Sequence, residues 1–300
     1  MGPTAAGKTA AAIFLHEKYG CNIVSVDSAL VYRGMDIGTA KPDATTLLRA
    51  PHELVDIIEP WQTYCAASFC ADAYQIMETS HKTGNIPLLA GGTMMYYRSL
   101  QQGLSSLPDA NKDIRQQLLT QAQSKGWEYM HQQLAKIDPS SAARINKGDP
   151  QRIQRALEVY EITGQTMSEL YLADQGTNLD YDVLKIIIAP ARTLLHTRIE
   201  QRFAIMLKQG FIEEVEALKA NPKITADMPS MRCVGYRQVW QYLNGELDYD
   251  EMIFKGVVAT RGLAKRQWTW LRKEQNAIWI DSSANGYLTT IQRLTREFIA

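Results

Sequence analysis

The first nine residues carry the pattern that most restricts how this chain can fold. The run Gly2-Pro-Thr-Ala-Ala-Gly7-Lys8-Thr9 fits G-x-x-x-x-G-K-[ST] and leads directly into a helical segment expected over residues 10–19. Glycines let the backbone curl so that its N–H groups and the helix N-terminus surround phosphate oxygens. Lys8 adds a point charge, and the Thr9 hydroxyl is a candidate ligand of Mg²⁺. The predicted polyphosphate site comprises Gly2, Pro3, Thr4, Ala5, Ala6, Gly7, Lys8 and Thr9.

Such a loop normally follows a strand, whereas only Met1 precedes it here. We therefore expect either a shortened start or a sheet without that strand, with a cost in stability and a less constrained loop. The loop by itself fits a kinase, an ATPase or a diphosphate-using transferase equally well.

Strand and helix patterns alternate over the first hundred residues. Asn22–Val26 and Ile86–Ala90 are short apolar runs, and residues 67–82 have a helical pattern. The alternation predicts an α/β fold with a parallel sheet and helices on both faces. Ligands of such sheets bind at the carboxyl ends of strands, where Asp27 and Gly91–Thr93 fall.

The pattern changes between residues 103 and 179, where helices are expected at 111–125, 127–136, 139–146, 150–163 and 166–172. Strand patterns return at Val183–Ala189 and Ala277–Asp281, around helices at about 193–220, 235–243 and 249–272. We predict a catalytic core of residues 1–102 and 180–300 and an all-helical insertion domain of residues 103–179. The tail after Asp281 shows no clear pattern.

Bulk composition narrows the partners. Lysine plus arginine (32) equals aspartate plus glutamate (32), so any nucleic-acid binding must come from local patches. The four scattered cysteines lack zinc-site spacing and are expected to be buried thiols. No signal peptide and no run of ~18 apolar residues is visible, which predicts a soluble, cytoplasmic protein.

Asp27 ends an apolar strand about twenty residues beyond the loop, so its carboxylate is expected to face the phosphate site. It is the best candidate for a general base, or it holds Mg²⁺ through water. The alternative is a turn or helix-capping aspartate.

Basic residues gather in two helical segments. Residues 255–273 hold six basic and no acidic residues, and Arg261, Lys265, Trp268 and Arg272 share one helical stripe. This arrangement suits RNA phosphates beside an aromatic ring, or else a solvated face with a core tryptophan. Arg152 and Arg155 begin another helix and could grip RNA or pair with Glu158. Arg198 and Arg202, four apart, could close over a diphosphate.

Five runs together resemble the bacterial type of the tRNA dimethylallyltransferase family. Their matches follow the same order as in that family and span most of the chain from residue 2 to residue 272. They are residues 27–42, GGTMMYYRSL (91–100), DPQRIQRALEVYEITG (149–164), RCVGYRQVW (232–240) and TRGLAKRQWTWLR (260–272).

The resemblance implies a kinase-like fold whose phosphate loop holds the diphosphate of dimethylallyl diphosphate, with Mg²⁺ as cofactor. It implies transfer of the dimethylallyl group to the exocyclic amine of the adenosine 3′ of the anticodon. The implied partner is the tRNA anticodon stem-loop. We expect the protein to act as a monomer and not to bind membranes.

The resemblance also assigns residues. Asp27 falls on the base, and Thr93 on a second catalytic position beside the reactive adenosine. Positions matching tRNA contacts are Asp27, Ser28, Ala29, Leu30, Thr93, Arg115, Gln151, Arg152, Ile153, Gln154, Arg155, Arg232, Cys233, Val234, Gly235, Tyr236, Arg237, Lys265, Arg266, Gln267, Trp268, Thr269, Trp270, Leu271 and Arg272.

Two other functions fit parts of the pattern. An ATP-dependent small-molecule kinase would use the same loop and Asp27 for phosphoryl transfer, but the helical insertion and the basic stripe count against it. A non-catalytic RNA-binding or switch protein would keep the basic stripe without needing Asp27 beside the loop.

Overall fold

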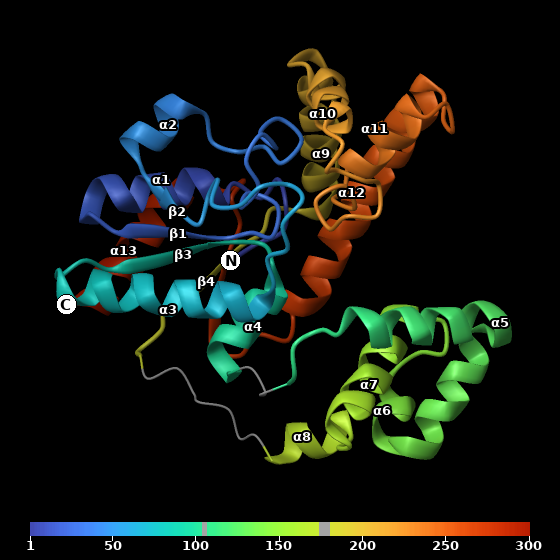
Figure 1. Cartoon of the computed structure of the whole chain (residues 1–300). Coiled ribbons are helices and arrows are strands. Elements are labelled where there is room, and N and C mark those ends of the chain that lie inside the picture. Colours follow the sequence, from blue (N-terminus) through green and yellow to red (C-terminus); the bar gives the residue numbers. More distant parts are fainter. Residues whose placement is uncertain (104–106, 174–180) are drawn as a thin grey trace. The chain divides into compact units, whose positions relative to one another are not determined.

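The computed structural model describes residues 1–103, 107–173 and 181–300, which form two compact units (Figure 1). Unit 1 comprises Met1–Ser99 and Tyr181–Ala300, and unit 2 comprises Leu100–Asp180. The insertion thus begins at Leu100 rather than at the expected residue 103. Its expected end, between residues 179 and 180, lies outside the described residues.

Unit 1 contains a parallel sheet in two parts. The strands β1 (Asn22–Val26), β2 (His52–Glu53) and β3 (Pro87–Gly91) are ordered β2-β1-β3, and β4 (Lys185–Ile188) pairs with β5 (Ala277–Ile280). The predicted α/β class with a parallel sheet is confirmed. Val26 pairs with Gly91, so the residues that follow β1 and β3 leave the sheet side by side.

The start of the phosphate loop is held between the two parts of the sheet. The Met1 amino group donates to the Ile186 carbonyl at 2.8 Å, and the Ile188 N–H donates to the Met1 carbonyl at 2.9 Å. A Cβ on Gly2 would lie 2.4 Å from the Ile188 carbonyl oxygen, and one on Gly92 would lie 3.2 Å from the Gly2 oxygen. Backbone contacts with β4 and with the end of β3 therefore position this loop.

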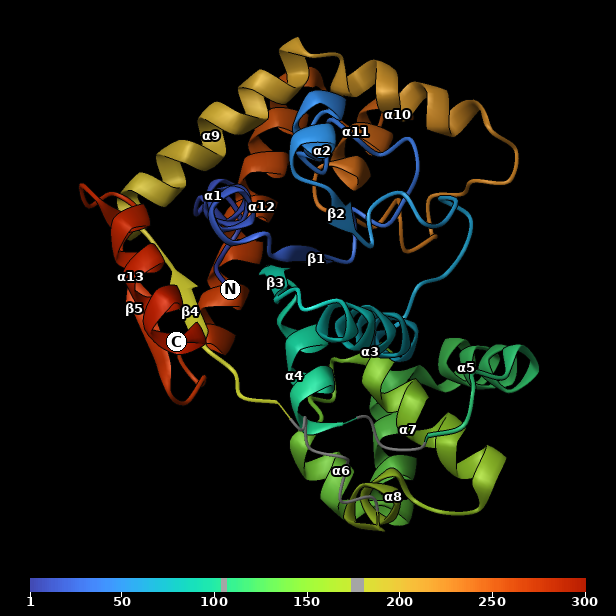
Figure 2. The ribbon, with the colours of Figure 1, turned by 90° about the vertical axis from the view of Figure 1, so that its left-hand side faces the viewer.

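The helices of unit 1 pack on the strands and on one another. They are α1 (Lys8–Tyr19), α2 (Ala44–Arg49), α3 (Ala66–Lys82), α9 (Arg192–Lys208), α10 (Phe211–Ala220), α11 (Tyr236–Leu243), α12 (Tyr249–Leu271) and α13 (Tyr287–Ile299), together with most of α4 (Met94–Gln102), whose last residues belong to unit 2. Helices α1 and α3 pack against β1 and β3. One core joins α9 to α12 around Phe203, Phe211 and Tyr236, and another joins α1, β4, β5, α9 and α13 (Figure 2).

The helix expected over 193–220 is two helices, α9 and α10, because Gly210 adopts φ 96° between them. The segments α2, β2 and α4 were not predicted, nor was α13. Cys21 and Cys70 are buried as expected, but Cys65 is exposed and Cys233 is partly exposed. The expectation of four buried thiols is therefore wrong for these two.

Unit 2 is helical in its described part: α5 (Lys112–Ile137), α6 (Pro139–Arg144), α7 (Pro150–Thr163) and α8 (Met167–Ala173). The two expected helices 111–125 and 127–136 are confirmed: α5 consists of two helical segments that meet at Gly126, whose φ of 81° is not helical. Its core gathers Leu118, Met130, Leu134 and Ile153. No helix among the described residues is long and apolar enough to span a bilayer.

Candidate active site

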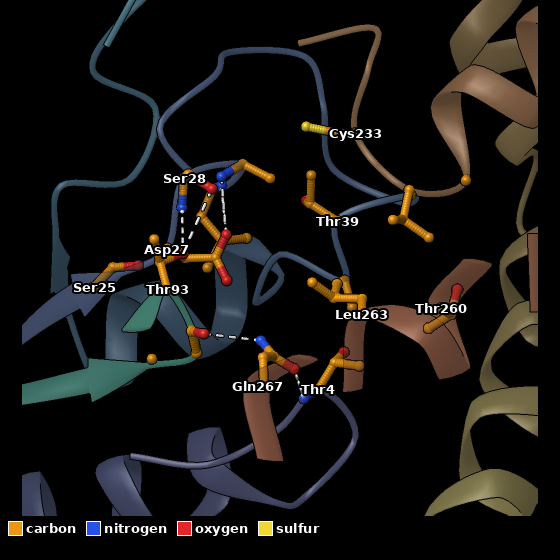
Figure 3. A pocket seen from close by; sticks show the side chains of 18 of the residues that line it. Thr4, Ser25, Asp27, Ser28, Thr39, Thr93, Cys233, Thr260, Leu263 and Gln267 are labelled. Atoms are coloured by element: carbon orange, nitrogen blue, oxygen red, sulfur yellow. Dashed lines mark hydrogen bonds between the residues drawn. The ribbon is translucent and has the colours of Figure 1, made fainter. Parts of the chain in front are cut away.

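A cavity of about 580 Å³ opens in unit 1 at the carboxyl ends of β1 and β3 (Figure 3). This volume falls in the usual range of small-ligand sites, about 300–1,000 Å³. The cavity brings together many of the predicted site residues: Thr4, Lys8, Thr9, Asp27, Ser28, Ala29, Leu30, Thr93, Arg232, Cys233, Val234, Gly235, Tyr236, Arg266, Gln267 and Trp270.

The phosphate loop folds as a tight curl at the N-terminus of α1. Ala5 and Gly7 adopt left-handed backbone conformations, with φ of 62° and 95°, and the Ala6 N–H donates to the Pro3 carbonyl at 3.3 Å. Ser282 supports the curl from outside by donating to the Ala6 carbonyl at 2.7 Å. Alternating conformations of this kind turn successive N–H groups toward one concavity, which suits an anion.

Two of the cationic residues that line the cavity, Lys8 and Arg202, lie on α1 and α9; Arg232 and Arg266 also line it. Lys8 donates to the Pro3 carbonyl at 2.8 Å, and Arg202 from α9 lines the same space. None of the ion pairs in the described ranges involves either residue. Burial lowers the pKa of Lys8 to about 8, with Arg202 adding to the decrease and Asp27 opposing it. A bound polyanion would neutralise both groups.

Arg198, the other arginine expected near a diphosphate, is placed differently. Its guanidinium donates to the Ser282 hydroxyl at 3.3 Å, and Ser282 in turn contacts the Ala6 carbonyl. Arg198 is not among the residues that line the cavity. It supports the phosphate loop from behind, whereas Arg202 faces the space that an anion would fill.

Asp27 stands at the end of β1 as predicted, with its carboxylate in the cavity. Its Oδ1 accepts the N–H groups of Ala29 at 2.9 Å and Leu30 at 3.4 Å, which fixes the side chain in a turn. Oδ2 is thereby the oxygen available to a proton or a metal-bound water. Asp27 is therefore a turn aspartate, which was the alternative, while its role as the general base stays a prediction.

Thr93 lies directly beside this turn. Its N–H donates to the Val26 carbonyl at 3.1 Å, its Oγ1 accepts the Ser28 N–H at 3.1 Å, and its hydroxyl donates to Ser28 Oγ at 3.4 Å. These bonds join the ends of β1 and β3. Thr93 therefore reaches the cavity next to Asp27, as the parallel-strand argument predicts (Figure 3).

Glu214 of α10 holds the loop that forms another wall of the cavity. Its carboxylate accepts the N–H groups of Asp36, Ile37 and Gly38 at 2.7–3.1 Å, together with the Tyr236 hydroxyl at 2.6 Å. Gly38 must lack a side chain, because a Cβ there would lie 2.1 Å from the Phe211 ring.

Lys41 fixes the same loop from within. Its side chain is only 3% exposed, and its ammonium pairs with Asp36 and Asp56 and donates to the Tyr32 carbonyl. Much of the matched run 27–42 therefore serves to build this wall.

Cys233 faces Asp27 across the cavity (Figure 3). Burial, with a smaller contribution from the Asp27 charge, raises the pKa of the Cys233 thiol to about 12. The thiol therefore stays protonated near neutral pH and is a poor nucleophile, because the thiolate is the reactive form.

The basic segment of α12 is partly as expected. Lys265, Arg266, Thr269 and Arg272 are exposed. Arg261, however, pairs with Glu200 of α9. Trp268 stacks on Trp279 of β5, with ring centroids 5.2 Å apart, and the Arg272 guanidinium lies 5.7 Å from the Trp268 ring. The predicted stripe therefore leaves Lys265 and Arg272 exposed, while Arg261 and Trp268 pack internally.

Three residues matched to tRNA contacts have side chains that no RNA can reach. Ile153, Tyr236 and Leu271 are 0% exposed. Ile153 belongs to the core of unit 2, and Tyr236 is held by Glu214. The prediction of RNA contact by these side chains is wrong, because their apolar surface is used in packing.

The matched arginines of unit 2 converge on one buried carboxylate. Glu158 is 0% exposed, and it accepts Arg115 at 2.9 and 3.1 Å and Arg155 at 2.8 Å. Burial disfavours the charged form, but the bonds from Arg115 and Arg155 outweigh it and lower the pKa of Glu158. The pairing of Arg155 with Glu158 is the alternative that the sequence left open. Arg152 instead pairs with Asp149, and Gln151 is exposed.

This cluster predicts a stability effect. Glu158→Gln is expected to lower the free energy of unfolding by roughly 2–3 kcal/mol. This is less than the ~3–5 kcal/mol of a fully buried pair, because Arg115 and Arg155 remain 44% and 26% exposed. Urea unfolding measures the change, with the exposed Glu161→Gln as control. Equal stability of both variants at neutral pH would contradict it.

A magnesium ion is compatible with the donor set. Thr9 supplies a hydroxyl and Asp27 a carboxylate to the same cavity. No group of three His, Cys, Asp or Glu in the described part of the chain could hold a metal. Mg²⁺ is commonly bound by one or two carboxylates together with substrate phosphates and water. The residues therefore fit an ion that arrives with a phosphorylated ligand.

The sequence patterns did not reveal Ser25, which lines the cavity, or Glu214, which holds the loop of one wall. Ser25 lies two residues before Asp27 on the same strand face, and its buried hydroxyl has no hydrogen-bond partner among the described residues. The two-residue period of a strand could have revealed it. Glu214 could not have been found, because its partners lie up to 178 positions away.

The fold and site define a class: an α/β enzyme with a phosphate loop and an acidic group at the end of the neighbouring strand. The family model of IPP transferase matches residues 30–274. The chain belongs to this family and is a prenyl-transferring enzyme.

Solved structures agree. The tRNA isopentenylpyrophosphate transferase of Bacillus halodurans is 32% identical, with a TM-score of 0.72, over 99% of this chain and 94% of that one. The corresponding enzyme of Staphylococcus epidermidis is 30% identical, with a TM-score of 0.71, over 99% and 96%. A eukaryotic dimethylallyltransferase acting on tRNA shares the fold, with a TM-score of 0.82 at 24% identity over 99% and 78%.

Proposed function

We propose that the chain transfers a dimethylallyl group from dimethylallyl diphosphate to the exocyclic amine of the adenosine 3′ of the anticodon in tRNA. The observation that carries the proposal is the pair of cations, Lys8 and Arg202, that face one cavity with Asp27 and a phosphate loop. We further propose Mg²⁺ as the cofactor, the tRNA anticodon stem-loop as partner, and a monomer working in the cytoplasm.

The cavity suits an allylic donor. The loop and the two cations offer a place for a diphosphate, and apolar side chains such as Leu30, Met206 and Leu263 line the remaining wall. An allylic diphosphate ionises readily once the charge of its leaving group is neutralised. A bound Mg²⁺ held through Thr9 would add to that neutralisation.

The acceptor chemistry uses Asp27. As the adenine nitrogen forms its bond to the allylic carbon, the carbon–oxygen bond to the diphosphate breaks and its electron pair leaves with the diphosphate. The nitrogen is a poor nucleophile because its lone pair is delocalised into the ring, and it loses one of its two protons so that the product amine is neutral. In this proposal Oδ2 of Asp27 accepts that proton, because Oδ1 already accepts the Ala29 N–H, and Thr93 and Ser28 shape the neighbouring wall. The adenine is expected to be flipped out of the anticodon loop to reach this site.

The direct test is incubation with unmodified tRNA, dimethylallyl diphosphate and Mg²⁺, followed by mass analysis of the nucleosides. A mass gain on the adenosine 3′ of the anticodon is expected. Matched incubations with ATP in place of the prenyl donor test the kinase alternative. ATP consumption without a modified nucleoside would reject the proposal.

The exposed cations of α12 predict a measurable RNA contact. Lys265→Ala and Arg272→Ala are each expected to weaken tRNA binding and to lower the log–log salt slope by about 0.7–0.9, as for one lost phosphate contact. The exposed Arg296→Ala of α13, outside this face, is the control. A wild-type slope in both variants would assign these residues to a solvated surface.

A further inference from the structure

Gln267 occupies an unusual place on α12. Its neighbours Lys265 and Arg266 are exposed, but the Gln267 side chain turns into the cavity. Its amide oxygen accepts the Thr4 N–H at 2.8 Å, and its amide nitrogen donates to the Gly92 carbonyl at 2.9 Å. Figure 3 shows the single amide bridging the phosphate loop and the end of β3. Both ends of the amide are therefore occupied by protein backbone.

The absence of a side chain at Gly92 leaves room for the Gln267 amide. A Cβ on Gly92 would lie 2.5 Å from the Gln267 amide nitrogen and 3.2 Å from the Gly2 carbonyl oxygen, so glycine leaves room for both. Gly92 does not adopt a positive φ, so its backbone conformation alone does not demand glycine. The close approach of the Gln267 amide and of the Gly2 oxygen favours it.

Thr93, the residue after Gly92, lies beside Asp27, where the proposed function puts the adenine acceptor. Thr93 binds Ser28 and the Val26 carbonyl, and Ser28 follows Asp27. Thr4 in the phosphate loop is therefore hydrogen-bonded to Gln267, and Gln267 to Gly92. The next residue, Thr93, is hydrogen-bonded to Ser28 in the turn that carries Asp27. Reaction rates depend steeply on such spacing, since a displacement of about 1 Å can cost ~10²-fold.

We propose that Gln267 does not contact tRNA but is a positioning residue, which fixes the distance between the phosphate loop and the turn that holds Asp27 and Thr93. This proposal rests on the proposed prenyl transfer. Gln267 acts on the geometry of the reaction, so its loss affects the chemical step more than the binding of either substrate.

Gln267→Ala is expected to lower single-turnover transfer by roughly 10–10²-fold. The melting temperature and the affinities for pyrophosphate and tRNA are expected to stay close to wild type. The exposed Gln75→Ala of α3 is the control for loss of a glutamine. An unchanged rate, or a rate loss matched by an equal loss of pyrophosphate affinity, overturns the proposal.

Gln267→Glu keeps the size of the side chain but changes its hydrogen bonding, so it separates the effect of the bridge from the effect of side-chain volume. An ionised carboxylate accepts from Thr4 but cannot donate to Gly92, whereas the protonated acid does both. The rate of this variant divided by that of wild type is therefore expected to rise as the pH falls. The ratio divides out pH effects that are common to the two enzymes. A flat ratio contradicts the bridge.

A double-mutant cycle tests whether Gln267 acts through Gly92. Gly92→Ala is expected to displace the amide and to slow transfer like Gln267→Ala, and the double variant is expected to be little slower than either single one. Additive losses overturn the proposal.

A separate measurement distinguishes failure of the proposed prenyl transfer from failure of the Gln267 bridge. If the wild-type chain modifies no tRNA, the proposed transfer fails. Gln267→Ala is still expected to speed hydrogen exchange at the Thr4 amide, and unchanged exchange there rejects the bridge itself.

Discussion

Asp27→Asn is expected to slow single-turnover transfer by roughly 10²–10⁴-fold while changing the donor and tRNA affinities little. The substitution suits the question because an asparagine oxygen can still accept the Ala29 and Leu30 N–H groups that fix the turn. What it removes is the basicity of the second oxygen. Single-turnover measurement is needed, since slow product release would hide a chemical defect in the steady state.

Two further results make the Asp27 test specific. Asp27→Glu is also expected to be slow, because a longer side chain displaces the carboxylate from the turn and spoils the attack geometry. Near wild-type transfer by Asp27→Asn would show that the proton leaves by another route, such as solvent or the departing diphosphate. The unpaired Ser25 hydroxyl is too weak a base to take over.

Local patterns were enough to predict the parts of the site that depend on neighbouring residues. The phosphate loop, β1 and the position of Asp27 follow from short runs of sequence. The proximity of Asp27 and Thr93 follows from one rule, that parallel strands end at the same edge of a sheet. The pairing of Arg155 with Glu158 is a contact between residues three apart in α7.

Contacts between distant segments could not be read from the sequence. Gln267 meets Thr4 across 263 positions, and Trp268 stacks on Trp279 of another element. A helical stripe shows which residues share a face but not what covers it, so the sequence left open whether Trp268 lies beside RNA or in the core. The helix α13 was missed although Ile291 and Thr295 are buried four apart, because a single amphipathic segment at a chain end carries little contrast.

Resemblance to a family assigns positions but not the manner in which a side chain acts. Within the matched runs, Leu271 and Tyr236 are packing residues, and Gln267 binds backbone on both sides. Only the exposed members, such as Lys265 and Arg272, have surface to offer a polyanion. Burial therefore divides one matched segment into residues that build the site and residues that can bind a partner.

Lys8→Ala is expected to reduce kcat/KM for dimethylallyl diphosphate by roughly 10²–10³-fold, as for loss of a group that stabilises developing charge. The tRNA affinity measured without donor is expected to stay unchanged, because Lys8 contacts the Pro3 carbonyl inside the loop. The exposed Lys18→Ala at the far end of α1 is the matched control. Unchanged donor kinetics in Lys8→Ala would reject the loop as the diphosphate site.

The pKa of Lys8 adds a pH signature. Burial lowers that pKa to about 8 in the free enzyme, so the ammonium is charged below about pH 8 and loses its proton as the pH rises further. Only the charged form attracts the diphosphate, so kcat/KM for the donor is expected to fall above this pH. Asp27 raises the pKa of Lys8, so Asp27→Asn is expected to move the fall to lower pH. Lys8→Ala lacks the titrating group, and a fall at the same pH in that variant would assign the titration to another residue.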